Sequence, residues 1–124
     1  MAKSDPREYN DVEIAASGSL SGAAKLGGAG LIGIIIPTGT GAFATNTDRL
    51  YFYGSVDDTT YVLIRDNDGS AVAVTIAVNN TNGATHLDPD KFRAWSSVKV
   101  GTHRNDTGAA VAQSAKKTFT LISE

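Results

Sequence analysis

The acidic side chains best suited to metal chemistry lie in the segment Asp66–Gly69, which copies the opening of a calcium-binding loop. An EF-hand loop needs a bidentate carboxylate at its twelfth position, and Ala77 stands there. Asp57 and Asp58 could add ligands only if their loop lies at the same end of the molecule. We therefore interpret these acids as solvated turn residues and expect no metal ion.

The residues that could support catalysis lack the spacing that catalysis needs. His86 and His103 are the only histidines, and neither has a second ligand two or four residues away. No Gly-x-Ser-x-Gly elbow activates a serine, and the glycines of segment 27–30 precede an apolar run rather than a helix. We interpret both histidines as hydrogen-bonded structural residues, and we expect neither enzyme activity nor a cofactor.

Two tyrosines are the strongest candidates for binding. Tyr51 and Tyr53 alternate with Leu50 and Phe52, so a strand would place them on the face opposite these apolar side chains. Tyrosines at alternate positions of an outward face suit a protein interface or a sugar platform. Partial burial under a loop explains the same pattern equally well, and the sequence leaves these alternatives open.

The N-terminal segment is polar and contains one proline. Residues 1–11 are predicted to form a flexible arm that is either mobile or becomes ordered on a partner. Arg7 and Tyr9 are the candidate interface residues of this arm. The start of the chain is too polar for a signal peptide.

Composition limits the functions available to the chain. Its 124 residues make one domain, which we place at residues 12–124, and 41% hydrophobic residues allow a packed core. The net charge of −2 predicts no nucleic-acid partner, and no apolar stretch reaches the ~18 residues of a membrane helix. The absence of cysteine excludes disulfides and thiolate chemistry.

The elements that must position the candidate residues are strands, because the hydrophobic pattern has a period of two. Turn signals such as Asp66–Gly69 separate the short apolar runs, and residues 61–65 and 71–76 are predicted to pair as a hairpin. We predict an all-β, single-domain β-sandwich, either a jelly roll or Ig-like, with seven to eight short antiparallel strands. Phe52, Phe92 and Phe119 are predicted core residues, with Trp95 at the edge of the core.

Several segments, taken together, resemble a family of small virion proteins of tailed phages and prophages. These segments are residues 31–37, 50–61, 63–69, 87–92, 98–100 and 111–121. Their order and spacing match the family over roughly residues 12–122. The family pattern has Asp-Gly where Asp57-Asp58 stands, and an aromatic-containing stretch in place of residues 38–41; both departures fall in predicted loops.

The resemblance implies a structural role in the virion and supplies no catalytic residues. It implies a capsid cement or decoration protein that binds the assembled shell of major capsid protein and stabilises it. A carbohydrate- or protein-binding module at the phage neck or tail is the alternative. The partners expected are the major capsid protein and further copies of the chain, as a dimer or trimer. The expected location is the capsid exterior, after synthesis in the bacterial cytoplasm.

Overall fold

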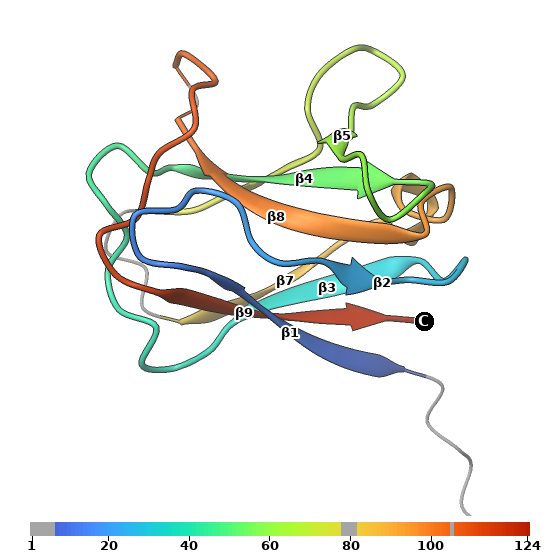
Figure 1. Ribbon diagram of the computed structural model, residues 1–124, viewed down its shortest axis with the longest axis horizontal. Coiled ribbons are helices and arrows are strands. Elements are labelled where there is room, and N and C mark those ends of the chain that lie inside the picture. The colour runs from blue at the N-terminus through green and yellow to red at the C-terminus, as the bar shows by residue number, and fades with distance from the viewer. Residues whose placement is uncertain (1–6, 78–81, 105) are drawn as a thin grey trace, which may run out of the picture.

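The protein is an all-β sandwich in a computed structural model that describes residues 7–77, 82–104 and 106–124. Two antiparallel sheets lie face to face, as Figure 1 shows. One has the strand order β1-β9-β3-β7, and the other has the order β2-β8-β4-β5, with β6 also on β4. The strands are β1 (Glu8–Ile14), β2 (Ala24–Lys25), β3 (Leu31–Ile36), β4 (Arg49–Ser55), β5 (Val62–Leu63), β6 (Ala73–Thr75), β7 (Gly83–His86), β8 (Ser97–His103) and β9 (Lys117–Ser123). The predicted β-sandwich is confirmed, and the described residues form nine strands instead of the predicted seven or eight.

The core lies between the sheets and follows the period-two pattern. In β4, Leu50 and Phe52 are fully buried, whereas Tyr51 and Tyr53 on the other face are half-buried. The ring of Phe52 meets that of Phe92 edge-on, with 5.2 Å between centroids. Trp95 packs against this core while remaining partly exposed, as predicted for a residue at its edge.

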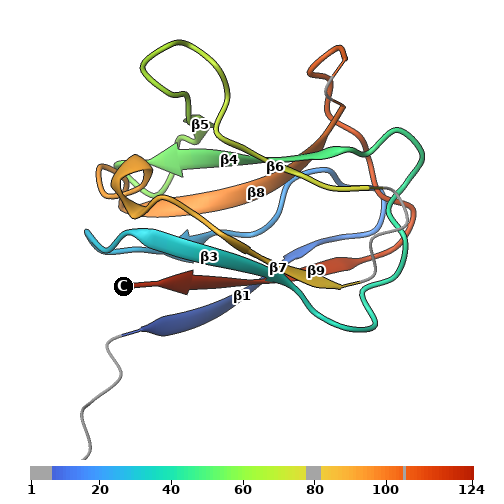
Figure 2. The ribbon, with the colours of Figure 1, turned by 180° about the vertical axis from the view of Figure 1, so that it is seen from behind.

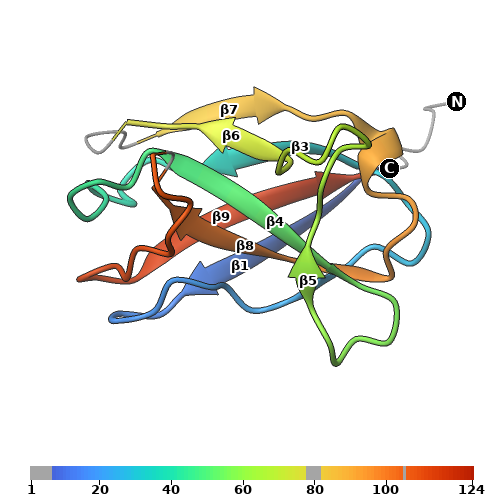
Figure 3. The same ribbon diagram turned by 90° about the horizontal axis from the view of Figure 1, so that it is seen from above.

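The two long C-terminal strands occupy inner positions of the two sheets. β8 lies between β2 and β4, and β9 lies between β1 and β3. Seen from above in Figure 3, β4 and β8 of one sheet cross over β9 and β1 of the other. The β4–β8 ladder therefore joins two segments that are far apart in the chain. This ladder sets which side chains of β4 and β8 are neighbours on the outer face of the sheet.

The segment after β4 forms the predicted hairpin only next to its turn, where the Val72 N–H donates to the Ile64 carbonyl and the Asp66 N–H donates to the Ser70 carbonyl. Further from the turn, the two arms pair with β4 as an interrupted edge strand. β5 pairs with the end of β4 and β6 with its beginning, so both lie on the same edge of β4. Between them the chain leaves the sheet in the excursion loop (residues 65–71), visible above β5 in Figure 1. The predicted turn is present, because the Gly69 N–H donates to the Asp66 carbonyl and Gly69 has a positive φ of 91°.

The N-terminal strand begins earlier than predicted. Residues 8–11, which we assigned to the flexible arm, form β1, and all of β1 pairs with β9. That part of the assignment is wrong because an edge strand needs to bury only one face, here through Val12 and Ile14, and tolerates polar residues elsewhere. Residues 1–6 of the arm lie outside the described residues.

Candidate interaction surfaces

The predicted tyrosine pair forms one cluster with a histidine, which we call the tyrosine face (Tyr51, Tyr53, Gly101 and His103). The rings of Tyr51 and Tyr53 both stack on His103, with centroid separations of 4.4 and 5.8 Å. The Tyr53 hydroxyl lies 2.8 Å from His103 Nε2, within hydrogen-bond distance. The cluster lies on the outer face of the five-stranded sheet, where the alternation of β4 predicts the tyrosines.

The register of β4 against β8 explains why Tyr53 can reach His103. Tyr51 is opposite Gly101 and Tyr53 is opposite Lys99, so His103 lies diagonally across the ladder from Tyr53. Gly101 leaves the intervening space open. A β-carbon there would lie 2.9 Å from Tyr53 Cε2 and 3.0 Å from His103 Nε2.

The chain that follows β8 covers the tyrosine face in part. His103 is buried, and its Nδ1 lies 3.0 Å from the Gly108 carbonyl in the loop that returns over the sheet. Burial raises the pKa of the Tyr53 phenol, and the neighbouring Tyr51 adds to this effect. Tyr51 and Tyr53 are partly buried, and the loop contacts His103, on which both tyrosine rings stack. Each of the two tyrosines remains partly exposed and therefore available for contact.

The Asp57-Asp58 loop is held by hydrogen bonds to its own carboxylates. Asp58 Oδ1 accepts from the hydroxyls of Ser96 and Ser97 at 2.7 Å each, and Lys25 lies 3.2 Å from Oδ2. These hydrogen bonds lower the pKa of Asp58 to about 2, and the bond from Ser97 has the largest effect. Asp58 has a positive φ of 61°, a conformation in which glycine costs less.

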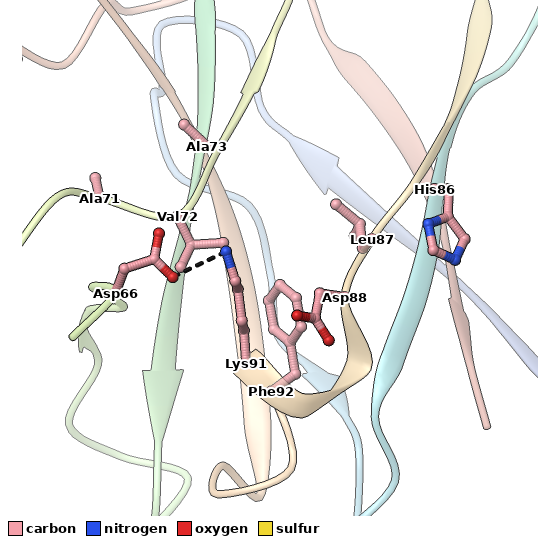
Figure 4. A pocket seen from close by; sticks show the side chains of 9 residues that line it. All are labelled: Asp66, Ala71, Val72, Ala73, His86, Leu87, Asp88, Lys91 and Phe92. Atoms are coloured by element: carbon pink, nitrogen blue, oxygen red, sulfur yellow. Dashed lines mark ion pairs between the residues drawn. The ribbon is translucent and has the colours of Figure 1, made fainter. Parts of the chain in front are cut away.

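At one edge between the sheets, β6 lies across from β7 and the 3₁₀ helix η1 (Pro89–Lys91) that follows it (Figure 2). A groove opens there, lined by these elements and the excursion loop (Figure 4). Its volume is about 260 Å³. Its lining residues are Asp66, Ala71, Val72, Ala73, His86, Leu87, Asp88, Lys91 and Phe92.

An ion pair spans this groove. Lys91 Nζ lies 2.9 Å from Asp66 Oδ1, and the hydrogen bond to this carboxylate raises the pKa of Lys91. Asp66, the first acid of the calcium-like segment, is therefore paired with a lysine. Across the described ranges, no group of three or more acidic or histidine side chains is arranged to hold a metal ion. Sequence reasoning missed the Asp66–Lys91 pair, because its partners meet only when the two sheets stack.

Of the N-terminal candidates, Tyr9 lies on β1 and Arg7 directly precedes this strand, both away from the tyrosine face. The Arg7 guanidinium lies 5.9 Å from the ring centroid of Tyr9, and Tyr9 is 54% exposed. Asp11, two residues further on, accepts a hydrogen bond from the Thr120 hydroxyl at 2.7 Å. The structure therefore brings Tyr51 and Tyr53 together on one surface, and it places Arg7 and Tyr9 on another, along the edge strand β1.

Two solved structures of other proteins are similar to this chain. The chain is similar to the SPBc2 prophage-derived protein YomS, with a TM-score of 0.50 and 12% identity over 99% of this chain and 98% of that one. It is also similar to CBM32-1 from a family 31 glycoside hydrolase of Clostridium perfringens, with a TM-score of 0.44 and 12% identity over 92% and 76% of the chains. At these identities, the likeness to YomS shows the fold alone.

Sequence comparison adds no relative. No family model and no curated protein matches the chain.

Within the described part of the chain, no helix is long and apolar enough to cross a membrane.

Proposed function

We propose that the chain is a structural virion protein that binds the assembled shell of major capsid protein on its outer surface. The observation that carries this proposal is the likeness in fold to a prophage-derived protein over nearly the whole of both chains. The sequence resemblance to virion proteins of tailed phages supports it independently.

Four of the six segments that carry the sequence resemblance contain strand residues of the two sheets, whereas residues 63–69 are mainly the excursion loop and residues 87–92 contain η1. Residues 31–37 contain β3, residues 50–61 contain most of β4, and residues 98–100 lie in β8. Residues 111–121 lead into β9 and contain most of it. The resemblance therefore concerns mainly the strands of the packed framework, which suits a protein whose role is to present a rigid surface.

A cement protein requires a stable fold and a surface that prefers the assembled shell to free capsid subunits. Such a preference stabilises the shell by mass action, because each bound copy adds its binding free energy to the assembled state alone. Tyr51 and Tyr53 on the tyrosine face supply partly exposed aromatic area for such a contact. The absence of cysteine agrees with assembly in the reducing cytoplasm of the bacterial host.

Purified particles provide the test. The chain should co-purify with particles in hundreds of copies, on the order of the number of capsid subunits, and its removal should lower the temperature at which the shell opens. Roughly a dozen copies or fewer would place it at the neck or tail instead, since those rings have few subunits. If purified particles contain the other capsid proteins but not this chain, the proposal is contradicted.

Carbohydrate binding is the competing role for the same tyrosines. A sugar platform needs free aromatic faces, yet Tyr51 and Tyr53 each use one ring face to stack on His103. A glycan array decides between the two roles. Glycan binding that Tyr51→Ala abolishes while the fold is retained would replace the capsid proposal with a receptor-binding one.

A further inference from the structure

β1 is the edge strand of its sheet, with β9 as its only strand partner among the described residues. Edge strands present unpaired backbone groups to which another chain can add. We propose that the partner of this edge is a second copy of the chain, with the two β1 strands antiparallel across a two-fold axis at Tyr9. The two four-stranded sheets then join into one continuous sheet of eight strands.

The hydrogen bonds around β1 show which of its residues face outward. The Glu13 carbonyl accepts from the Gly22 N–H at 3.2 Å, so the backbone of Glu13 points away from β9. Thr118 is the residue of β9 opposite Glu13. The backbone of Thr118 points away from β1, because its carbonyl accepts a hydrogen bond from the hydroxyl of Thr40, in the segment after β3. Backbone direction alternates along a strand. The outward groups therefore belong to the odd-numbered residues.

Two outward residues have no other backbone partner. Within the part of the chain that the structure describes, Tyr9 and Asp11 form no backbone hydrogen bond outside the β1–β9 ladder. Their side chains lie on the exposed face of the sheet, because Val12 fills the core from the opposite face. An incoming strand can bond to this edge without disturbing the core.

Charge complementarity selects the register. With Tyr9 on the two-fold axis, Arg7 of each copy lies opposite Asp11 of the other, and the two Tyr9 rings meet. Tyr9 and Asp11 are outward residues, and Arg7 directly precedes β1 in the same alternation. In this register the opposed pairs would exchange backbone hydrogen bonds. The symmetry provides two arginine–aspartate pairs and one aromatic contact at the centre.

The neighbouring registers are less favourable for identifiable reasons. An axis at Glu8 places two carboxylates against each other, and an axis at Asp11 does the same. An axis at Asn10 or at Asp11 also needs the backbone of Glu13, whose carbonyl is already bonded to Gly22. Only the axis at Tyr9 uses complementary charges and leaves the Glu13–Gly22 bond intact.

The pairing concerns the chain alone and does not depend on the capsid. Five paired residues on each side make a small interface, so association should depend on concentration and be strengthened where copies lie side by side. The test therefore uses the purified full chain. A chain that stays monomeric overturns the pairing and leaves capsid binding untested by that result.

A single introduced cysteine tests the axis, since the chain contains no other cysteine. Opposed residues of a hydrogen-bonded pair have Cα atoms about 5.5 Å apart, which a disulfide spans. Tyr9→Cys should therefore form a covalent dimer under mild oxidation. Asp11→Cys is the matched control, because its two copies would lie about 14 Å apart along the strands. A mixture of Arg7→Cys and Asp11→Cys chains should cross-link one to the other.

The cross-linking results are decisive in both directions. Absence of a Tyr9→Cys dimer at high concentration would overturn the proposal. Equal cross-linking of Tyr9→Cys and Asp11→Cys would overturn it too, because random collision would explain both. A dimer specific to Tyr9→Cys, with the mixed Arg7–Asp11 pair, supports the axis.

Charge reversal tests the ion pairs without a covalent link. Arg7→Glu or Asp11→Arg alone should raise the dissociation constant of the dimer roughly tenfold, since each breaks two symmetric pairs. The double variant Arg7→Glu/Asp11→Arg restores opposite charges across the axis, and it should recover the dimer in sedimentation equilibrium. A double variant as weak as the two single ones would overturn the Arg7–Asp11 pairing.

Discussion

The hydroxyl of Tyr53 and Nε2 of His103 lie 2.8 Å apart, although the two residues are separated by 50 positions in the sequence. They belong to adjacent strands, and the missing side chain of Gly101 lets the Tyr53 ring cross the ladder diagonally. On its other side, His103 meets the Gly108 carbonyl of the covering loop. One imidazole thus connects β4 to the loop that follows β8.

Removal of the Tyr53 hydroxyl should destabilise the fold moderately. Tyr53→Phe keeps the stacked ring but leaves Nε2 of His103 without this partner, which should cost about 1 kcal/mol. For a domain of this size the melting temperature should fall by about 4 °C. Tyr51→Phe is the matched control, because it leaves the Tyr53–His103 bond in place. An unchanged melting temperature in Tyr53→Phe would mean that the bond contributes nothing net.

The space left by the missing side chain of Gly101 should be required for the stability of the fold. Gly101→Ala inserts a β-carbon within 3.0 Å of both Tyr53 and His103, so one ring must move. We expect a loss of about 1–3 kcal/mol in the free energy of unfolding, measured by urea denaturation. Gly22→Ala provides the comparison, because nothing lies within 4 Å of its added carbon. If the two variants unfold alike, the diagonal crossing does not depend on the missing side chain.

The Phe52–Phe92 pair should dominate the core. Both rings are fully buried, and Phe52→Ala removes the edge-on contact as well as the apolar volume. The expected cost is about 3–5 kcal/mol, a large part of the stability of an ordinary domain. Val56→Ala, at a side chain that is 72% exposed, should change stability by less than about 0.5 kcal/mol. A small effect of Phe52→Ala in calorimetry would contradict the described core.

Acid should weaken the loop that Asp58 holds. The folded-state pKa of Asp58 is lowered from 3.8 to about 2, so its stabilising effect is complete above about pH 4 and is lost as the pH falls towards 2. Asp58→Asn tolerates the same positive φ but cannot carry the charge. Above about pH 4 the variant should be less stable than the natural chain, and the difference should close near pH 2. A difference that does not vary with pH would show that the charge is not responsible.

The strands whose pattern is local were predictable from sequence. Leu50 and Phe52 alternate with tyrosines, and Phe119 and Leu121 alternate with threonines, so both the strands and their buried faces followed from the period of two. The pairing of strands was less predictable. The segments around the Asp66–Gly69 turn join through a bridge at Arg65 and Ala71, but β5 and β6 pair with β4, which offers a long edge with a complete ladder.

The surface clusters depend on contacts that no local pattern encodes. His103 is one of two histidines, and its spacing to other residues gave no reason to connect it with Tyr53. A weak signal existed, because Gly101 interrupts the alternating run of β8 two residues before His103. The Lys91–Asp66 pair had no such signal, since it depends on how one sheet lies on the other.

The excursion loop between β5 and β6 is a suitable site for the insertion of a foreign peptide. The ladder on β4 stops at Leu63 and resumes at Ala73, so the tip of the excursion loop supplies no strand that the sheet needs. A foreign peptide inserted between Asn67 and Asp68 would project from the body, while Ile64 and Val72 stay buried as its two anchors. If the chain does coat a shell, this loop would allow many copies of an epitope to be displayed on each particle.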